Sequence, residues 1–444
     1  MINSGEPVVL NETPSGQLLA KTYYSGFELA HDTYNAISAA SDGKIYYILS
    51  SESIDVGGQM FVYDPTTDQT TLLADLTEVC GEKDKKAIPQ GKSHVNFLEH
   101  HGKLYFATHI GHYELINGRE GLPVNLPPGY QPYPGGHLLS YDLRTGAFED
   151  LAIAPHGEGV LTLTMDQERG QLYGITWPEG YFIRYDLQLG TLENFGPVSQ
   201  AGEAGTPGQD YRVLCRSMFV DPRDGKVYFS TSEGDIFAYC LVENTITKIE
   251  GVHLRLDYFG IYDPCRPGSM GYNWRKICWH PLEKVAYAVH GNSGYLFRFD
   301  PRKSTVELME RITSRPSRLS GMFDQFSYGY LGFELAPDRE TVYYLTGGPI
   351  YEHGQRVEGE KEIAKGGAKG LENLHLVTYH LPTQYYQDHG PVFYADGARP
   401  TYVNSIAVGS GGSIYTLARF EHQGSVIQDL IKISKPLIRT SKKR

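Results

Sequence analysis

Apolar and polar positions alternate with a period of two along most of the chain, in short runs separated by polar or glycine-rich turns. Two such runs form a pair in each repeat. The second run of the pair follows a turn and in several repeats ends in aspartate, as at Asp64, Asp142, Asp186 and Asp300. With one apolar run before this pair and one after it, each repeat contains four short β-strands. The first run of the pair ends in a tyrosine and recurs seven times, at intervals of 55 to 72 residues, at Tyr46, Tyr105, Tyr173, Tyr228, Tyr287, Tyr343 and Tyr415.

Seven repeats of four strands predict an all-β fold, a seven-bladed β-propeller with four antiparallel strands per blade. We expect residues 1–444 to form a single domain, because a closed ring cannot be divided without opening both halves. The first blade is expected to begin near Tyr34, and residues 1–33 to supply a strand that closes the ring against the C-terminal blade. The basic residues 435–444 are expected to form a flexible tail.

Composition limits the classes of partner and compartment. The net charge of −12 argues against nucleic acid as a partner. No run of 18 apolar residues indicates a membrane span, and the N-terminus has neither the basic nor the apolar segment of an export signal, which favours a cytoplasmic location. Five cysteines without a CxxC pair are typical of unpaired thiols in a reducing compartment.

The chemistry is expected on one face of the ring. In a propeller, the start of each innermost strand and the loop between the second and third strands open on the same face. Blade two places His94 before its first strand, His109 and His112 after its second, and His137 at the start of its third. The next three blades add further residues to this face, namely Trp177, Tyr211, Arg212, Arg216, Tyr272, Arg275 and His290.

Two of these arginines are expected to act together. Arg216 and Arg275 both stand twelve residues before the repeat tyrosine of their blade, so they occupy equivalent places in adjacent blades. Two long insertions, at residues 110–136 and 347–373, are expected to wall the same face, since long loops on a rigid scaffold carry binding sites.

Histidine and arginine around an aromatic-lined funnel suit a substrate with an acid group beside a carbon that loses a proton. Arginine binds a carboxylate through two parallel hydrogen bonds, and histidine titrates close to neutrality. Abstraction of the α-proton of a uronic acid has these requirements, and the leaving glycosidic oxygen needs a general acid. The expected partner is therefore an acidic oligosaccharide or polysaccharide.

Several segments resemble those of the seven-bladed β-propeller polysaccharide lyases, a group that includes oligogalacturonate lyases, ulvan lyases and lyases that release rhamnose linked to glucuronate. The similarity spans the chain at the level of the blade pattern. It is carried by Ser93-His94, by residues 103–109 ending in Thr108-His109, by residues 136–142 beginning Gly136-His137, by residues 173–178 ending in Trp177-Pro178, and by Cys215-Arg216-Ser217.

The resemblance implies β-elimination at a uronic acid. It makes His109 and His94 the candidates for the base, one acting in its neutral form while the other orients substrate or holds an ion. Activity is then expected to fall on acidification near the ordinary histidine pKa of about 6.5. His137 would be a second proton-handling or binding residue, and Arg216 with Arg275 would neutralise the carboxylate.

The catalytic tyrosine and any metal ion stay open at this point. Tyr211 and Tyr272, both near the start of an innermost strand, are the candidates for the tyrosine of such lyases. No cofactor is required by the sequence, and the histidines show no ligand spacing that fixes a metal site, although a divalent ion such as calcium, manganese or zinc is compatible with them.

Two other functions compete with the lyase. One is a non-catalytic propeller that binds a glycan or a protein partner. The other is a metal-dependent hydrolase or lactonase with a central ion held by acidic and amide groups. The nearest acidic residues are Glu334 and Asp324, and the available amides are Asn35, Asn96, Asn273 and Asn404.

Overall fold

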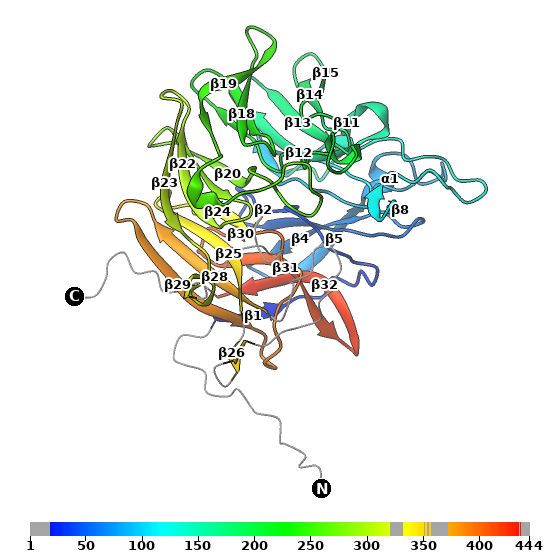
Figure 1. Cartoon of the computed structure of the whole chain (residues 1–444). Coiled ribbons are helices and arrows are strands. Elements are labelled where there is room, and N and C mark those ends of the chain that lie inside the picture. The colour runs from blue at the N-terminus through cyan, green and yellow to red at the C-terminus, as the bar shows by residue number, and fades with distance from the viewer. Residues whose placement is uncertain are drawn as a thin grey trace.

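Four-stranded antiparallel units repeat seven times along the chain and form the blades of a β-propeller (Figure 1). The structure is a computed structural model, and it describes residues 18–319, 332–349, 351–352, 355–356, 372–434 and 436. The seven-bladed all-β fold expected from the tyrosine repeat is confirmed. Asp324 and, apart from Pro436, the tail at residues 435–444 lie outside the described residues.

The first three blades follow one another in sequence, each strand pairing with the next. Blade one consists of β2 (Ile37–Ala39), β3 (Ile45–Leu49), β4 (Gln59–Asp64) and β5 (Gln69–Asp75). Blade two consists of β6 (Leu98–His100), β7 (Lys103–Ala107), β10 (His137–Asp142) and β11 (Phe148–Ile153). Blade three consists of β12 (Gly159–Asp166), β13 (Gln171–Trp177), β14 (Tyr181–Asp186) and β15 (Thr191–Pro197).

Blades four to seven complete the ring. Blade four consists of β16 (Phe219–Asp221), β17 (Lys226–Ser230), β18 (Asp235–Cys240) and β19 (Thr245–His253). Blade five consists of β20 (Trp274–His280), β21 (Val285–His290), β22 (Tyr295–Asp300) and β23 (Thr305–Arg311). Blade six consists of β24 (Phe333–Leu335), β25 (Thr341–Pro349), β28 (Glu372–His380) and β29 (Tyr385–Phe393). Blade seven consists of β30 (Ala407–Val408), β31 (Ile414–His422), β32 (Ser425–Ile433) and β1 (Leu18–Thr22).

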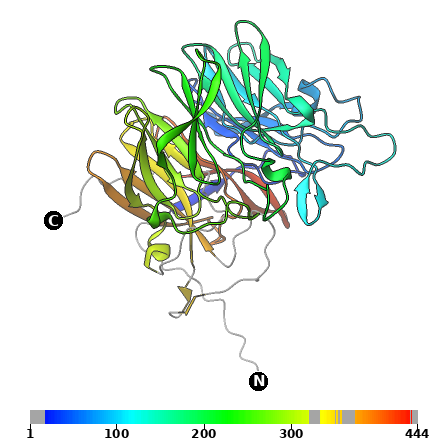
Figure 2. The same cartoon turned by 45° about the horizontal axis from the view of Figure 1, so that its top comes forward.

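Short helices and two small hairpins decorate the loops. The helices are α1 (Leu76–Val79) and α2 (Arg315–Leu319), with single 3₁₀ turns at Pro155–Gly157, Gly202–Ala204 and Asp257–Phe259. The hairpins are β8 (Glu114–Ile116) with β9 (Arg119–Gly121), and β26 (Tyr351–Glu352) with β27 (Gln355–Arg356). They fall in the two long insertions between second and third strands, and β8–β9, coloured cyan, stands out from the ring in Figure 2.

The repeated residues have clear structural roles. Each of the seven repeat tyrosines lies in the second strand of its blade and is at least 92% buried. The aspartates that end third strands accept hydrogen bonds from backbone N–H groups of the following turn, as Asp64 does from Thr66 at 2.8 Å and Asp142 from Thr145 at 2.7 Å. This side-chain-to-backbone bonding stabilises the tight turn and explains why aspartate recurs there.

The core lies between the blades rather than within one compact centre. One buried cluster joins Tyr46 of blade one, Phe106 of blade two and Ile183 of blade three. Another joins Tyr47 of blade one to Tyr415 of blade seven, across the point where the two ends of the ring meet. Each blade is therefore stabilised by its neighbours on both sides.

The N-terminal strand closes the ring. Ala20, Lys21 and Thr22 of β1 pair antiparallel with Ile433, Lys432 and Ile431 of β32. Leu18 and Leu19 also pair parallel with β29 of blade six, so blades six and seven share one eight-stranded sheet. In Figure 1 the dark blue β1 lies beside the red strands of blade seven.

Two further findings concern the cysteines and the helices. All five cysteines are unpaired thiols, and Cys80 and Cys215 are buried. No helix within the described ranges is both long and apolar enough to cross a membrane.

A buried charge on β1 should destabilise the closed ring. Ala20 is 5% exposed and faces the core, whereas its neighbour Leu19 is 49% exposed. We expect Ala20→Asp to lower the free energy of unfolding by about 2–4 kcal/mol, because a carboxyl group would be buried without a partner. The matched variant Leu19→Asp should change it by less than about 1 kcal/mol. Thermal and denaturant unfolding of both variants provide the measurement, and equal effects would show that β1 is not held in the ring as described.

Candidate functional site

Two histidines of blade two lie ring against ring at the funnel. His94 precedes β6 and His109 follows β7, and their ring centroids are 4.3 Å apart. The backbone of His109 exchanges both hydrogen bonds with Lys92, at 2.7 and 2.9 Å, which extends the pairing of the blade beyond the strand ends. The two rings are thus brought together by the sheet itself.

His109 is enclosed on all sides. Only 1% of the residue is exposed, and its ring packs on Trp177 with the centroids 5.4 Å apart. Its Nδ1 lies 2.9 Å from the carbonyl oxygen of Ile110, so Nδ1 carries the proton and Nε2 the lone pair. Burial lowers the pKa of His109 to about 3, so the ring is neutral at pH 7. Gly159 is needed beside it, since a Cβ there would lie 2.7 Å from the ring.

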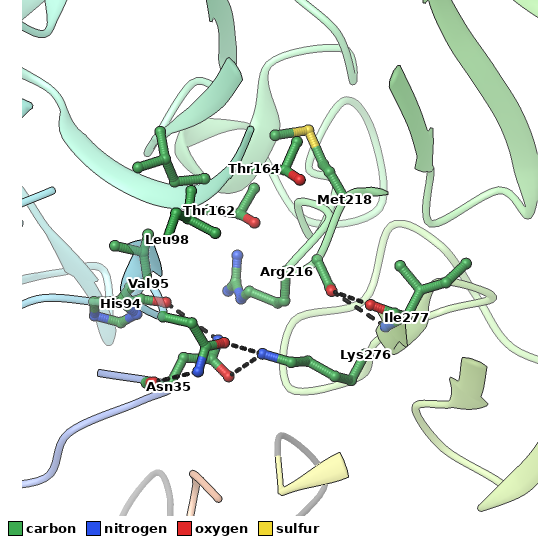
Figure 3. A pocket seen from close by; sticks show the side chains of 13 residues that line it. Asn35, His94, Val95, Leu98, Thr162, Thr164, Arg216, Met218, Lys276 and Ile277 are labelled. Atoms are coloured by element: carbon green, nitrogen blue, oxygen red, sulfur yellow. Dashed lines mark hydrogen bonds between the residues drawn. The ribbon is translucent and has the colours of Figure 1, made fainter. Parts of the chain in front are cut away.

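His94 is the less buried histidine of the pair. Its side chain is half-buried and lines a cavity of about 150 Å³ in the central channel (Figure 3). The ring of Tyr34, itself half-buried, stacks on the other side of His94 with an interplanar angle of 8° and a centroid distance of 5.3 Å. His94 therefore lies between His109 and an accessible aromatic ring.

Glu203 organises the neighbouring charged and aromatic groups. It lies in the loop between blades three and four, and its carboxylate accepts a hydrogen bond from the Trp177 indole at 3.0 Å. The same carboxylate forms an ion pair with Arg216 at 2.5 Å and accepts from the backbone N–H of Leu214 at 3.2 Å. Trp177 is 4% exposed, so the structure assigns it to packing in this network rather than to stacking on a sugar.

Tyr211 belongs to the same group of residues. It is 6% exposed, and the guanidinium of Arg119 lies over its ring at 5.5 Å. Arg119, in the β8–β9 hairpin, also donates to the carbonyl oxygen of Gly205 at 2.7 Å, which joins the insertion of blade two to the loop that carries Glu203. Burial raises the pKa of Tyr211 well above its ordinary value, and the Glu203 carboxylate adds to the effect. Tyr211 therefore keeps its proton at neutral pH.

The cavity is polar on several sides. Figure 3 shows the Arg216 side chain in the middle of the lining, with His94 on one side and the hydroxyl groups of Thr162 and Thr164 nearby. Lys276 reaches across from blade five, and its ammonium donates to the side-chain oxygens of Asn35, at 3.0 Å, and of Asn96. The cavity thus combines two cationic side chains, a histidine and hydroxyl groups.

The expected pairing of Arg216 with Arg275 is corrected by the structure. A β-bulge interrupts the pairing of β20 between Trp274 and Lys276, and Arg275 is the residue at the bulge. Its guanidinium contacts the sulfur of Met270, and the residue is 5% exposed. Lys276 lines the cavity in its place, because the bulge changes which side chain points to the channel.

His137 is held by structural partners outside the cavity. His137 lies between Asp150, 2.9 Å from Nδ1, and Glu82, 3.0 Å from Nε2, so carboxylates occupy both ring nitrogens. Burial lowers its pKa, but the hydrogen bonds to Asp150, Cys80 and Glu82 outweigh this and raise the pKa to about 11. His137 is therefore a charged structural residue and does not extend the cavity.

Arg212 and His112 also have structural partners. Arg212 forms an ion pair with Glu233 and donates to the carbonyl oxygens of Gln209 and Tyr211, at 3.0 and 2.7 Å. His112 is half-buried and its Nδ1 lies 3.1 Å from the carbonyl oxygen of Glu52. Neither residue lines the channel cavity.

Tyr272 and His290 form a separate aromatic group in the loops of blades four and five. His290 is fully buried, stacks on Phe259 with centroids 4.1 Å apart, and has its Nδ1 2.7 Å from the Ser293 hydroxyl. The Tyr272 hydroxyl accepts from the backbone N–H of Tyr262 at 3.2 Å. Neither residue lines the channel cavity, although both were expected on the funnel face.

The channel amides do not form a metal site with acidic residues. Among the described residues, no three His, Cys, Asp or Glu side chains gather closely enough to hold a metal ion. The Lys276 ammonium takes the amide oxygens of Asn35 and Asn96, and Asn273 donates to the carbonyl oxygen of Val213 at 3.1 Å. Three of the four channel amides are therefore engaged in hydrogen bonds within the protein.

Sequence reasoning missed two residues that shape the cavity and its surroundings. Lys276 was hidden by the bulge beside it. Glu203 stands in an irregular stretch rich in glycine, residues 198–210, where no strand period marks its direction. The available signal for Glu203 was that it is an acidic residue in the loop that connects two blades.

No protein-family model matches the chain, and no curated protein matches it in sequence. Among solved structures, a chain of "Crystal Structure of Mitotic Checkpoint Complex" superposes with a TM-score of 0.49 and 9% identity, over 92% of this chain and 93% of that chain. This similarity says nothing about the activity of the present protein.

The burial of His109 predicts a pH dependence of stability. In the unfolded chain a histidine binds a proton below pH 6.5, whereas folded His109 does so only below about pH 3. Between these values the unfolded state binds more protons, so the free energy of unfolding falls as the pH falls. We expect His109→Gln to remove a contribution of up to about 1.4 kcal/mol per pH unit in this range.

The measurement is denaturant unfolding at several pH values from 6 down to 4. The control is the variant His101→Gln, because His101 is exposed. The control should keep the wild-type slope. An unchanged slope in His109→Gln would contradict the enclosed, neutral state of this ring.

Proposed function

We propose that the protein is a lyase that cleaves a glycosidic bond at a uronic acid by β-elimination. The observation that carries the proposal is the cavity lined by both His94 and Arg216. One side chain is suited to take a proton and the other to bind the adjacent carboxylate, and they come from different blades that face the same space. The resemblance to β-propeller polysaccharide lyases supports the same reaction.

In the proposed mechanism, Arg216 binds the uronate carboxylate and stabilises the negative charge that develops on it. Neutral His94 accepts the proton from the carbon next to the carboxylate. The electrons of that C–H bond form a carbon–carbon double bond, and the bond to the glycosidic oxygen at the adjacent carbon breaks. The leaving oxygen takes a proton from a general acid. The candidate from the sequence is Tyr211, which lies in the neighbouring Glu203 group and not in the cavity lining.

His109 acts on His94 rather than on the substrate. Its enclosed ring packs 4.3 Å from the ring of His94 and so holds that ring in place. Glu203 orients the guanidinium of Arg216 through their ion pair. The base is therefore His94, and His109 is a positioning residue.

The activity is tested by the absorbance of an unsaturated uronate. Elimination creates a carbon–carbon double bond conjugated with the carboxylate, which absorbs in the near ultraviolet. The protein is mixed with polymers and oligomers of galacturonate and of glucuronate, and with neutral glucans as controls. A rise with a uronate substrate supports the lyase. Binding of a uronate without any rise would favour the non-catalytic alternative, and a fall in glycan length without a rise would favour hydrolysis.

Replacing the base should abolish most of the activity. We expect His94→Ala to lower kcat by at least about a hundredfold, the usual scale for the loss of general acid–base catalysis. The control His290→Gln changes another buried histidine in a separate aromatic group and should retain wild-type kcat. The initial rate of absorbance change gives both values. Full activity in His94→Ala, with loss of activity in Tyr211→Phe, would move proton abstraction to the tyrosine.

Replacing the carboxylate-binding arginine should also impair turnover. Loss of a charge-assisted contact that strengthens in the transition state costs about 2–4 kcal/mol, so we expect Arg216→Gln to lower kcat/KM by about 30- to 1000-fold. Arg298→Gln is the matched control, because Arg298 pairs with Glu307 on the outer strands of blade five. If both variants retain wild-type kcat/KM, Arg216 does not bind the substrate carboxylate.

A further inference from the structure

Lys276 brings an ammonium group into the central channel from blade five. Its two hydrogen-bond acceptors, the side-chain oxygens of Asn35 and Asn96, belong to blades one and two and carry no net charge. None of the ion pairs among the described residues includes this ammonium, and Glu334 acts on it through its charge. Its positive charge is therefore solvated by amides but not neutralised by contact.

Two carboxylates act on the cationic groups of the cavity. Arg216 adds a second cation, whose ion pair with Glu203 connects it to the loop between blades three and four. Glu334 of blade six is the acidic group that influences Lys276, and burial raises its pKa to about 8 while burial lowers the pKa of Lys276 to about 8. The hydroxyl groups of Thr162 and Thr164 line the same space as uncharged donors, whereas the Ser217 hydroxyl donates to the carbonyl oxygen of Ile277 at 3.4 Å.

This combination of donors fits an anion. Two cationic side chains and two threonine hydroxyl groups offer N–H and O–H donors to one cavity of about 150 Å³. That volume admits a small group such as a carboxylate or a phosphate but not a sugar chain, which would have to lie above it. Guanidinium and ammonium groups both bind such oxyanions through charge-assisted hydrogen bonds.

We propose that the channel cavity is an oxyanion subsite in which Lys276 and Arg216 bind the same carboxylate-sized anion. The identification of that anion as the uronate carboxylate rests on the proposed function. Lys276 then supplies the second positive group that sequence analysis assigned to Arg275. The shared chemistry also suits inorganic phosphate, which is the other source of the anion.

The test is isothermal titration of the full-length protein with glucuronate, galacturonate, glucose and inorganic phosphate. The variant Lys276→Met removes the charge and keeps the length of the side chain, and Lys276→Gln retains a donor to the channel amides. Lys276→Arg restores the charge. The control Lys248→Met removes an exposed lysine that pairs with Asp235 on the outer part of blade four. Circular dichroism and thermal unfolding report whether each variant folds.

We expect wild type and Lys248→Met to bind a uronate but not glucose. Lys276→Met and Lys276→Gln should bind it at least about tenfold more weakly, and Lys276→Arg should recover much of the affinity. Competition by phosphate would identify a general oxyanion site, whereas uronate binding without phosphate competition would identify a site for a sugar carboxylate. Equal uronate affinity in wild type and in a folded Lys276→Met or Lys276→Gln variant overturns the inference, as does a wild type that binds none of the anions.

The same variants separate this inference from the proposed function. Charge-dependent anion binding with no elimination from any uronate substrate would keep the subsite and remove the lyase. Elimination at the wild-type kcat/KM in a folded Lys276→Met variant would keep the lyase and remove Lys276 from the site.

Discussion

The pairing of β1 with β32 is the constraint on which the rest of the structure depends. Neighbouring blades share their buried clusters, so a ring left open between blades seven and one would expose two apolar blade faces. Closure also fixes the channel. Asn35 and Lys276 are 241 positions apart in sequence and come within hydrogen-bond distance only because blades one and five face the same axis. The cavity is thus a product of the closed ring and not of any one blade.

Within the closed ring, the carboxylate of Glu203 holds the charged and aromatic groups beside the cavity in place. Glu203 contacts an indole N–H, a guanidinium and a backbone N–H, and so it links blade three to the segment that enters blade four. The guanidinium that it orients lines the cavity, while the indole packs against the enclosed ring of His109. The position of Arg216 and the burial of His109 therefore have a common origin, and a change at Glu203 would disturb both.

Much of the fold could be predicted because the chain repeats one pattern seven times. The tyrosine register marks the second strand of each blade, and the aspartate turns mark the ends of third strands, so strand order followed from local signals. The proximity of His94 and His109 could also be predicted from the sequence, since both flank adjacent strands of the same blade. The rule that placed them, that strand starts and second-strand ends share one face, holds wherever the strands run without interruption.

The rest of the site could not be predicted, for physical reasons that differ from residue to residue. Counting from Tyr287 placed Arg275 at the channel, but one extra residue in a bulge redirects side chains, and a sequence count does not register it. His137 does begin a third strand as expected. Its partner Glu82 arrives from the loop after α1, a long-range contact with no local signal, and this contact turns a candidate ligand into a structural cation.

The reach of Lys276 has a mechanical consequence. Its side chain starts on blade five and ends at amides of blades one and two, so its hydrogen bonds link these blades across the channel at the level of the innermost strands. A link of this kind opposes distortion of the ring in which blades move relative to one another. An anion that draws the ammonium toward itself would relax this bracing, and occupancy of the channel would then be felt in the rigidity of blades that the ligand does not touch.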